Sequence, residues 1–224
     1  MKPMSEAPLI SVLLILSAYL LGSIPFAYLA ARLSKGIDLR RYGSGTVSGS
    51  MVFEHVHHWM VVPVGILDVA KTALPTYLGL RLGLGEVVAA IAGIAAMIGH
   101  NWPIYLKFTG GRGISSILGI LLFFFPWGDA WLLGFLAVGY LLKDSAPWAL
   151  ASLASMPLLV LWLGGSGIVF WVIAATLAVM VCKRLEANRR PLPLDARERR
   201  RVLWLRLVFD RDIPDHQAWI RREL

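Results

Sequence analysis

The feature that most constrains this chain is an uninterrupted apolar run near its start. From Pro8 to Ala31 no residue carries a charge. A helix over this stretch, rising about 1.5 Å per residue, is long enough to cross a hydrocarbon core of about 30 Å. Hydrophobic residues make up 57% of the sequence and charged residues only 16%. These values exclude an ordinary soluble domain and predict an all-α protein that crosses a membrane several times.

Hydropathy predicts seven membrane-spanning helices. Their approximate ranges are 9–31, 59–80, 86–106, 114–127, 129–142, 147–164 and 166–182. We interpret the first range as one retained helix, because it is too long for a signal peptide and lacks a clear small-x-small cleavage pattern. The fourth and fifth ranges are short, so these two helices are expected to be tilted or incomplete.

Positive charge gathers in alternate connections between these helices. The cations lie in the first connection (Arg32, Lys35, Arg40 and Arg41), the third (Lys107 and Arg112), the fifth (Lys143) and the segment after residue 182. The positive-inside rule then places the N-terminus outside and the C-terminus in the cytoplasm. We therefore expect a seven-helix membrane domain over 1–182, with cytoplasmic Gly-rich loops at 34–58 and 107–113.

Residues 183–224 form a basic cytoplasmic tail. Within it, residues 195–209 interleave arginines with apolar residues, which predicts an amphipathic helix on the anionic inner leaflet. A helix that docks on a protein partner is the alternative. The following residues, 210–215, alternate in charge and are expected to be loosely ordered. The net charge of +8 is explained by these membrane-side cations, so no nucleic-acid partner is expected.

Two glycine-rich loops suit the binding of an anion. Residues 107–113 read Lys-Phe-Thr-Gly-Gly-Arg-Gly, and Ser115 follows them at the start of an apolar run. Glycines let the backbone turn and point N–H groups at one spot, while Lys107 and Arg112 add charge. The other loop comes first in the chain and contains Gly43-Ser44-Gly45-Thr46. We call it the first glycine-rich loop and residues 107–113 the second. Flexible connections are the alternative for both loops, but their predicted position on one side of the membrane favours a shared phosphate site.

Three polar residues fall within the predicted helices. Asp68 and Lys71 share one helix face at i and i+3, and each is costly in hydrocarbon, so we expect an inward-facing ion pair. His100 precedes Trp102-Pro103 and either handles a substrate proton or oxygen or is packed between helices. The cluster His55, His57 and His58 has only Glu54 as a nearby carboxylate, and the chain has one cysteine, so no metal is expected.

In this order, these residues resemble the bacterial acyl-phosphate:glycerol-3-phosphate acyltransferase family of the PlsY type. The resemblance rests on residues 22–26 (Gly-Ser-Ile-Pro-Phe), 36–40, 43–45, Leu67-Asp68 with Lys71, Gly99-His100 and above all 103–118. It implies an enzyme of the bacterial inner membrane with seven spans. The implied reaction moves a fatty acyl group from acyl phosphate to the sn-1 hydroxyl of glycerol 3-phosphate and makes lysophosphatidic acid. The resemblance implies no cofactor.

The resemblance also implies roles for individual residues. The catalytic residues would be Ser44, Lys107 and His100, supported by the ion pair of Asp68 and Lys71. The residues that would bind substrate and phosphate are Gly43, Gly45, Thr46, Gly110, Gly111, Arg112, Gly113, Ser115, Arg184 and Asn188.

The family's first and third motifs are altered in this chain. Glu54 stands where the first motif has an arginine, and Thr46 and Met51 replace further motif residues. In the third motif Leu185 replaces a histidine, while Arg184 and Asn188 remain. A carboxylate in place of a phosphate-binding cation repels phosphate at close range. Two alternatives therefore stay open: the same enzyme class with another acceptor, and a catalytically silent homologue that binds a lipid or a protein.

Overall fold

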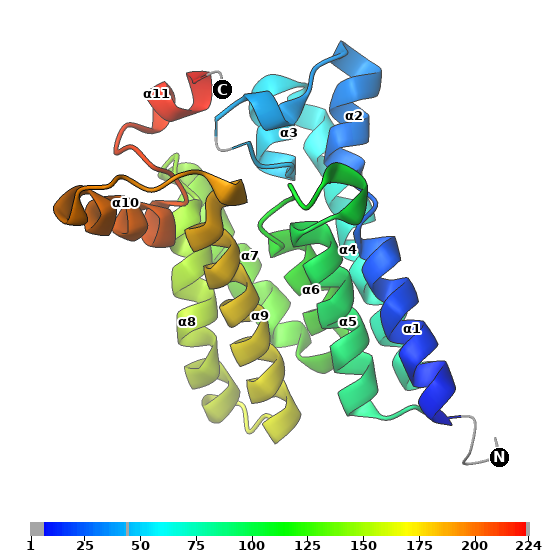
Figure 1. The fold of residues 1–224 in the computed structure, drawn as a ribbon. Helices are drawn as coiled ribbons and strands as arrows, with labels where there is room; N and C mark the ends of the chain where they lie inside the picture. Colours follow the sequence, from blue (N-terminus) through cyan, green and yellow to red (C-terminus); the bar gives the residue numbers. More distant parts are fainter. Residues whose placement is uncertain (1–6, 44, 223–224) are drawn as a thin grey trace.

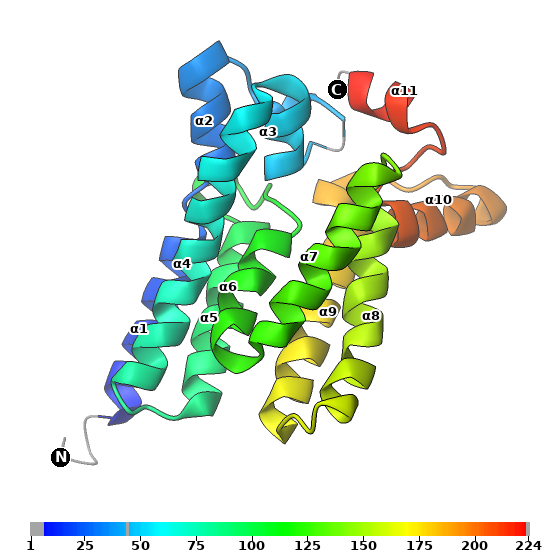
Figure 2. The same cartoon turned by 180° about the vertical axis from the view of Figure 1, so that it is seen from behind.

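The structure is a computed structural model that describes residues 7–43 and 45–222. Every regular element defined over these residues is a helix, and long helices packed side by side form the body of the molecule (Figures 1 and 2). The expected all-α class is therefore confirmed.

Helices follow all seven of the apolar ranges. They are α1 (Ala7–Gly22), α4 (Val61–Arg81), α5 (Glu86–Asn101), α6 (Ile114–Phe124), α7 (Pro126–Leu141), α8 (Ala146–Trp162) and α9 (Gly167–Glu186). By length and composition, four of the segments described are able to cross a membrane: Ala7–Lys35, His58–Arg81, Glu86–Leu106 and Gly167–Arg189. The helices α6 and α8 are apolar but shorter.

The first apolar range is not one continuous helix, so that prediction is wrong. The chain leaves the helical path after Gly22 and resumes as α2 (Phe26–Lys35). Pro25 has no N–H to donate and disfavours a helical Ile24 before it. At the break, the carbonyl of Ile24 accepts hydrogen bonds from the N–H of Phe26 at 3.2 Å and from Nζ of Lys71 in α4 at 3.0 Å.

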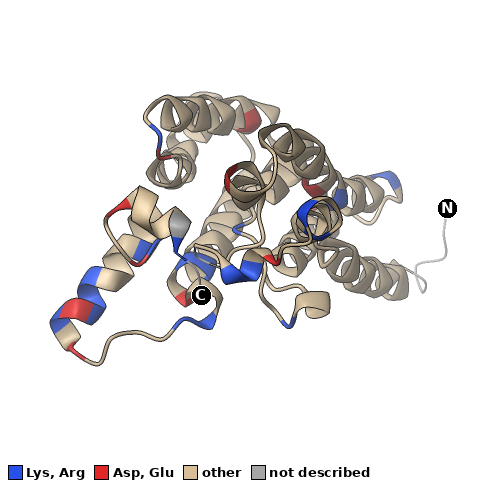
Figure 3. Ribbon diagram, turned by 90° about the horizontal axis from the view of Figure 1, so that it is seen from above, with Lys and Arg blue, Asp and Glu red and all other residues tan. Residues whose placement is uncertain are grey.

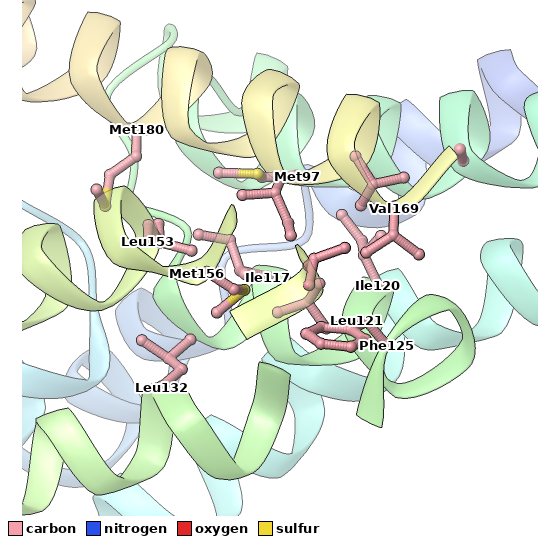
Figure 4. Packing of buried hydrophobic residues seen from close by; sticks show 14 residues of the cluster. Met97, Ile117, Ile120, Leu121, Phe125, Leu132, Leu153, Met156, Val169 and Met180 are labelled. Carbon is pink, nitrogen blue, oxygen red and sulfur yellow. The ribbon is translucent and has the colours of Figure 1, made fainter. Parts of the chain in front are cut away.

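An apolar core joins the two halves of the bundle. In Figures 1 and 2, α1, α4, α5 and α6 lie on one side and α7, α8 and α9 on the other. Side chains from α5 to α9 interlock between them, including Met97, Ile117, Leu132, Met156 and Val169 (Figure 4). The outer faces are also apolar, with the side chains of Leu158, Trp162 and Trp171 at least 69% exposed. Such a surface suits contact with lipid rather than water.

The smaller elements all cap one end of the bundle. They are α2, α3 (Gly49–His55), α10 (Ala196–Phe209), α11 (His216–Arg221) and the short 3-10 turns Leu39–Arg41, His58–Met60, Ile104–Leu106 and Ala187–Arg189. The helix α1 begins at the opposite end (Figures 1 and 2). Seen from above, this end carries the Lys and Arg residues of α10 and of the loops beside it (Figure 3). We call it the polar end.

The tail is more ordered than expected. Residues 196–209 are helical, in agreement with the predicted helix at 195–209. The segment 210–215, expected to be loosely ordered, is instead held by ion pairs of Asp210, Arg211 and Asp212 with residues elsewhere in the chain. It leads into α11, whose N-terminus is capped by Asp215. The prediction for this segment is therefore wrong, because its alternating charges find partners in three dimensions.

Candidate active site

Three segments that are far apart in the sequence meet at the polar end. The backbone N–H of Val47 donates to the carbonyl of Gly110 at 3.2 Å, which joins the two glycine-rich loops. The side-chain amide of Asn188, just after α9, donates to the carbonyl of Gly45 at 3.1 Å and to that of Gly110 at 3.5 Å. The two loops therefore form one surface, and Asn188 fixes their spacing.

Asn188 reaches the loops because the chain turns sharply at the end of α9. Ala187, Asn188 and Arg189 have φ values of 46°, 55° and 62°. Left-handed backbone is uncommon for residues other than glycine, and asparagine tolerates it better than most. This turn ends the helix and directs the Asn188 amide toward the carbonyls of Gly45 and Gly110.

The glycines of the second loop are needed for close packing against the end of α5. A Cβ on Gly110 would overlap the carbonyl oxygen of His100, and one on Gly111 would overlap the His100 ring at Nε2. Gly113 has φ of +79°, which favours glycine. The N–H of Gly111 donates to the carbonyl of His100 at 3.1 Å, so this amide serves the fold rather than pointing at a ligand.

A buried polar cluster supports these loops from below. Nζ of Lys71 lies 2.8 Å from Oδ1 of Asp68, and Nδ1 of His100 lies 3.5 Å from the same oxygen. The side chains of Asp68, Lys71 and His100 are no more than 7% exposed. Lys71 also holds the α1–α2 break through Ile24. The cluster therefore ties α4, α5 and the first break together beneath Gly111.

A hollow of about 540 Å³ opens beside Asn188 at the polar end. It is lined by Asp38, Arg40, Arg41, Gly45, Thr109, Asn188, Arg189, Arg190 and Pro191. Its volume lies within the usual range of roughly 300–1,000 Å³ for small-molecule sites. Four arginines against one carboxylate give the hollow a positive charge, which suits an anion.

The arginines of the hollow differ in how they are held. The guanidinium of Arg40 pairs with Asp38 at 2.7 Å, and this hydrogen bond holds the pKa of the Asp38 carboxyl below its usual value. Arg190 donates to the carbonyl of Gly43 and pairs with Asp212 at 3.5 Å, while burial lowers the pKa of Arg190. Within residues 7–43 and 45–222, no carboxylate pairs with Arg41 or Arg189. Neither guanidinium is neutralised by a carboxylate of these residues, and that of Arg189 also lies over the ring of Phe108, 5.7 Å from its centroid.

Other residues expected in the site lie outside the hollow. Lys107 is exposed in a left-handed turn after Ile104–Leu106. Arg112 is buried and donates to Oδ2 of Asp210 at 2.9 Å and to the carbonyl of Lys183 at 2.7 Å. Arg184 donates to the carbonyls of Leu207 and Ala146, so its guanidinium holds the tail.

The remaining expected residues sit near the two loops. Thr46 is buried between Gly45 and Val47, Ser115 is half-buried in the first turn of α6, and Ser44 lies outside the described residues. Glu54 is exposed on α3 and does not line the hollow. Glu54, the carboxylate that replaces a motif arginine, therefore lies away from the candidate site.

Sequence reasoning missed part of the hollow. Arg189, Arg190 and Asp38 line it but were not among the expected site residues. The available signal was the pair of arginines directly after Asn188, which is itself a motif residue. The contribution of Asp210 and Asp212 had no local signal, since their partners are at least six positions away.

Comparison of the chain with known proteins identifies its family. A sequence profile described as glycerol-3-phosphate acyltransferase matches residues 12–192. Glycerol-3-phosphate acyltransferase 5 of Dehalococcoides mccartyi is 34% identical over 222 residues, covering 96% of this chain and 94% of the relative. A glycerol-3-phosphate acyltransferase of a Synechococcus species is 37% identical over 184 residues, covering 80% and 89% of the two chains.

A solved structure is similar as well. The crystal structure of PlsY (YgiH), an integral membrane glycerol 3-phosphate acyltransferase, in its glycerol 3-phosphate form superposes with a TM-score of 0.71. It is 27% identical in sequence, and the match covers 80% of this chain and 90% of that one. The lysophosphatidic acid form of the same protein gives a TM-score of 0.70. Because the profile spans most of the chain and a relative 34% identical covers 96% of it, the protein belongs to the glycerol-3-phosphate acyltransferase family.

Proposed function

We propose that this protein transfers a fatty acyl group from acyl phosphate to the sn-1 hydroxyl of glycerol 3-phosphate and so makes lysophosphatidic acid for phospholipid synthesis. The observation that carries the proposal is the arginine-lined hollow, which Asn188 joins to both glycine-rich loops. Relatives are named for this acceptor, and the similar PlsY structures are its glycerol 3-phosphate and lysophosphatidic acid forms.

The phosphate of glycerol 3-phosphate fits the hollow. Arg41 and Arg189 supply charge that no carboxylate of the described residues neutralises, and Asn188 and Gly45 complete the wall. Guanidiniums bind phosphate through paired hydrogen bonds. Because Glu54 is exposed on α3 and Arg40 and Arg41 line the hollow, a charged acceptor is favoured over an uncharged one.

The reaction itself requires mainly positioning and charge stabilisation. The sn-1 hydroxyl oxygen attacks the acyl carbonyl carbon, the bond from that carbon to the bridging oxygen breaks, and the departing phosphate takes the hydroxyl proton. Positioning two reactants and stabilising the leaving charge are the main catalytic contributions needed for such an activated donor. We assign Arg112 and the 110–113 turn to the departing phosphate, with Thr46 and Ser115 beside it.

The expected catalytic residues take different proposed roles. Ser44, between Gly43 and Gly45 in the sequence, remains a candidate for contact with the acceptor. Lys107, exposed beside the second loop, attracts the anionic substrates. His100 lies beneath Gly111 and acts as a positioning residue, because its ring supports the turn from inside.

The polar end faces the cytoplasm in this proposal. The connections rich in cations lie at one end of the bundle and α1 begins at the other (Figures 1 and 3). Seven crossings of the bacterial inner membrane with an outer N-terminus satisfy the positive-inside rule. On α10, Arg197, Arg199, Arg200 and Arg201 are exposed, which suits contact with anionic lipid. Cross-linking in cells distinguishes this contact from a protein docked on α10.

One assay tests the function. Purified protein in lipid nanodiscs is given palmitoyl phosphate and labelled glycerol 3-phosphate, with palmitoyl-CoA and palmitoyl-acyl carrier protein as alternative donors. We expect labelled lysophosphatidic acid and inorganic phosphate in equal amounts from palmitoyl phosphate alone. Release of phosphate without acylation of this acceptor indicates another acceptor, and no turnover with any donor indicates a silent homologue; both outcomes contradict the proposal.

A further inference from the structure

A group of buried arginines lies at the polar end, and one of them, Arg206, donates to the backbone carbonyls of Arg190 and Pro191, which line the hollow. The side chains of Arg112, Arg184, Arg206 and Arg211 are no more than 8% exposed. A buried charge is costly unless it is paired and hydrogen-bonded. Nη1 and Nη2 of Arg184 donate to backbone carbonyls, whereas the other three arginines each pair with a carboxylate.

Three consecutive residues of the tail organise this group. Asp210 pairs with Arg112 at 2.7 Å, and Asp212 pairs with Arg206 at 2.6 Å and with Arg190 at 3.5 Å. Arg211 between them pairs with Asp144, in the connection before α8, at 2.7 Å. We call residues 210–212 the ion clamp. It joins the tail to the second glycine-rich loop, to the turn after α9 and to the α7–α8 connection.

We propose that Asp210 and Asp212 are positioning residues of the active site, each orienting one phosphate-binding arginine. Asp210 orients Arg112 toward the departing phosphate, and Asp212 orients Arg190 in the wall of the glycerol 3-phosphate hollow. The inference rests on the proposed function. It makes the tail beyond residue 192, where the family profile ends, a working part of the site.

The geometry at Arg112 supports this division. Its Nε donates to Asp210 and its Nη1 to the carbonyl of Lys183, two acceptors from different elements. Within the described residues, Nη2 makes no hydrogen bond, so one donor of the fork is left for a ligand. Because a guanidinium is planar and rigid, the orientation that Asp210 sets at Nε also fixes the orientation of Nη2. A lysine ammonium has no such plane.

Arg190 is likewise held by one carboxylate and one backbone carbonyl. Asp212 holds Nη1, while Nη2 donates to the carbonyl of Gly43 in the first loop. Asp212 is itself anchored by Arg206, which also donates to the carbonyl of Leu185 at 3.1 Å. The clamp thus fixes an arginine of the hollow relative to the loop that carries Ser44 in sequence.

The test compares isosteric variants of the full-length protein in nanodiscs. Asp210→Asn and Asp212→Asn each remove one carboxylate, and Glu198→Gln, exposed on α10, removes the same charge from the same tail as a matched control. Steady-state kinetics with palmitoyl phosphate and glycerol 3-phosphate give kcat and KM. Hydrogen exchange over residues 107–116 and 186–192 reports directly on the loops.

The two variants should separate kinetically. We expect Asp210→Asn to lower kcat about tenfold with KM for glycerol 3-phosphate little changed, and Asp212→Asn to raise that KM about tenfold, the scale of one lost charge-assisted hydrogen bond. Asp210→Glu should recover most of the lost kcat, and Glu198→Gln should match the wild type. Loss of stability alone lowers the active fraction, and so lowers kcat while leaving KM unchanged; it cannot produce the raised KM expected for Asp212→Asn, and kcat of Asp210→Asn is therefore given per active enzyme.

Three results overturn the proposal. The first is that both variants have the kinetics of the control, and the second is an equal loss of kcat in both with unchanged KM. The third is a lower KM in either variant, which shows that the tail competes with the substrate. A wild-type protein without turnover contradicts the proposed function instead. The clamp is then judged by hydrogen exchange, where faster exchange at 107–116 in Asp210→Asn but not in Glu198→Gln supports its positioning of the loop and equal exchange rejects it.

Discussion

Glu54 replaces a cation of the family's first motif, and the side chains around the hollow explain how the chain accommodates that change. Glu54 is exposed on α3, while the positive charge of the hollow comes from Arg40, Arg41, Arg189 and Arg190. Electrostatic binding of a phosphate depends on the cations within a few ångströms of it rather than on which motif supplies them. The acceptor site is therefore judged by the arginines that line it.

Arg41 and Glu54 provide a direct test. We expect Arg41→Gln to raise KM for glycerol 3-phosphate by roughly tenfold, because a hydrogen bond to a charged group contributes about 1.5–3 kcal/mol. Glu54→Gln should leave KM within about twofold of the wild type, since an exposed charge outside the site is screened by solvent. A larger change for Glu54→Gln than for Arg41→Gln in steady-state kinetics would place the acceptor elsewhere.

Gly111 has no room for a side chain. A Cβ there would overlap the imidazole of His100, which is fixed by Asp68 and has little freedom to move. We expect Gly111→Ala to abolish most activity and to lower the melting temperature in detergent. Gly134→Ala in α7 is the control, because a Cβ at Gly134 meets nothing within 4 Å. Equal activity of the two variants would show that the 110–113 turn does not depend on its contact with His100.

Among the helices, α4 carries the charge pair that holds the first break in place. Asp68 and Lys71 are buried one turn apart, and Lys71 reaches the carbonyl of Ile24 between α1 and α2. Removing one member of such a pair leaves a buried charge without a counter-ion, whereas removing both leaves none. The pair therefore matters for the packing of α1, α2 and α4.

The consequence is measurable by thermal unfolding in detergent. Lys71→Met should destabilise the protein by about 3 kcal/mol or more, within the range for a broken buried pair. The double variant with Asp68→Leu should be more stable than Lys71→Met alone, although it loses the contact with Ile24. If the fall in melting temperature of the double variant equals the sum of the falls in the two single variants, the two residues act independently.

Hydropathy predicts the helices well, because a membrane helix must present about twenty mostly apolar residues and this pattern is local. The seven ranges each contain a helix, and the basic helix of the tail begins within one residue of its expected start. The break at residues 23–25 was hidden inside an uncharged run. Its partner Lys71 lies 47 positions away, and no local pattern reports such a contact.

The candidate site was predictable only in part. The loops around Gly45 and Gly110 were expected to meet, and Asn188 bridges them. Arg184 and Arg112 were expected at the phosphate. The guanidinium of Arg184 instead holds the tail, and that of Arg112 is oriented by Asp210 and the carbonyl of Lys183. The direction in which the arginines at the end of α9 point depends on the turn at Ala187–Arg189. That turn has left-handed angles at three residues other than glycine, which cannot be read from the sequence.

For the protein in its membrane, the bundle and the polar end have to be considered together. Apolar side chains cover the outer faces of the helices, and the arginine-lined hollow opens at the end where the cation-bearing loops and the tail gather (Figure 3). This arrangement suits an enzyme that takes a water-soluble acceptor from one side and an acyl chain from the bilayer. It requires both loops and the tail to lie on the same side of the membrane.

Labelling of single cysteines tests that requirement. In a Cys182→Ser background, Ser166→Cys lies in the α8–α9 connection and Leu194→Cys lies in the tail, where Leu194 is 98% exposed. If the polar end is cytoplasmic, a membrane-impermeant maleimide should label Ser166→Cys in spheroplasts, while Leu194→Cys should react only after the membrane is opened. The helices lead these sites to opposite ends of the bundle (Figure 1), so they cannot share a side in a seven-span protein. Labelling of Leu194→Cys in intact spheroplasts would place the hollow outside the cell, away from cytoplasmic glycerol 3-phosphate.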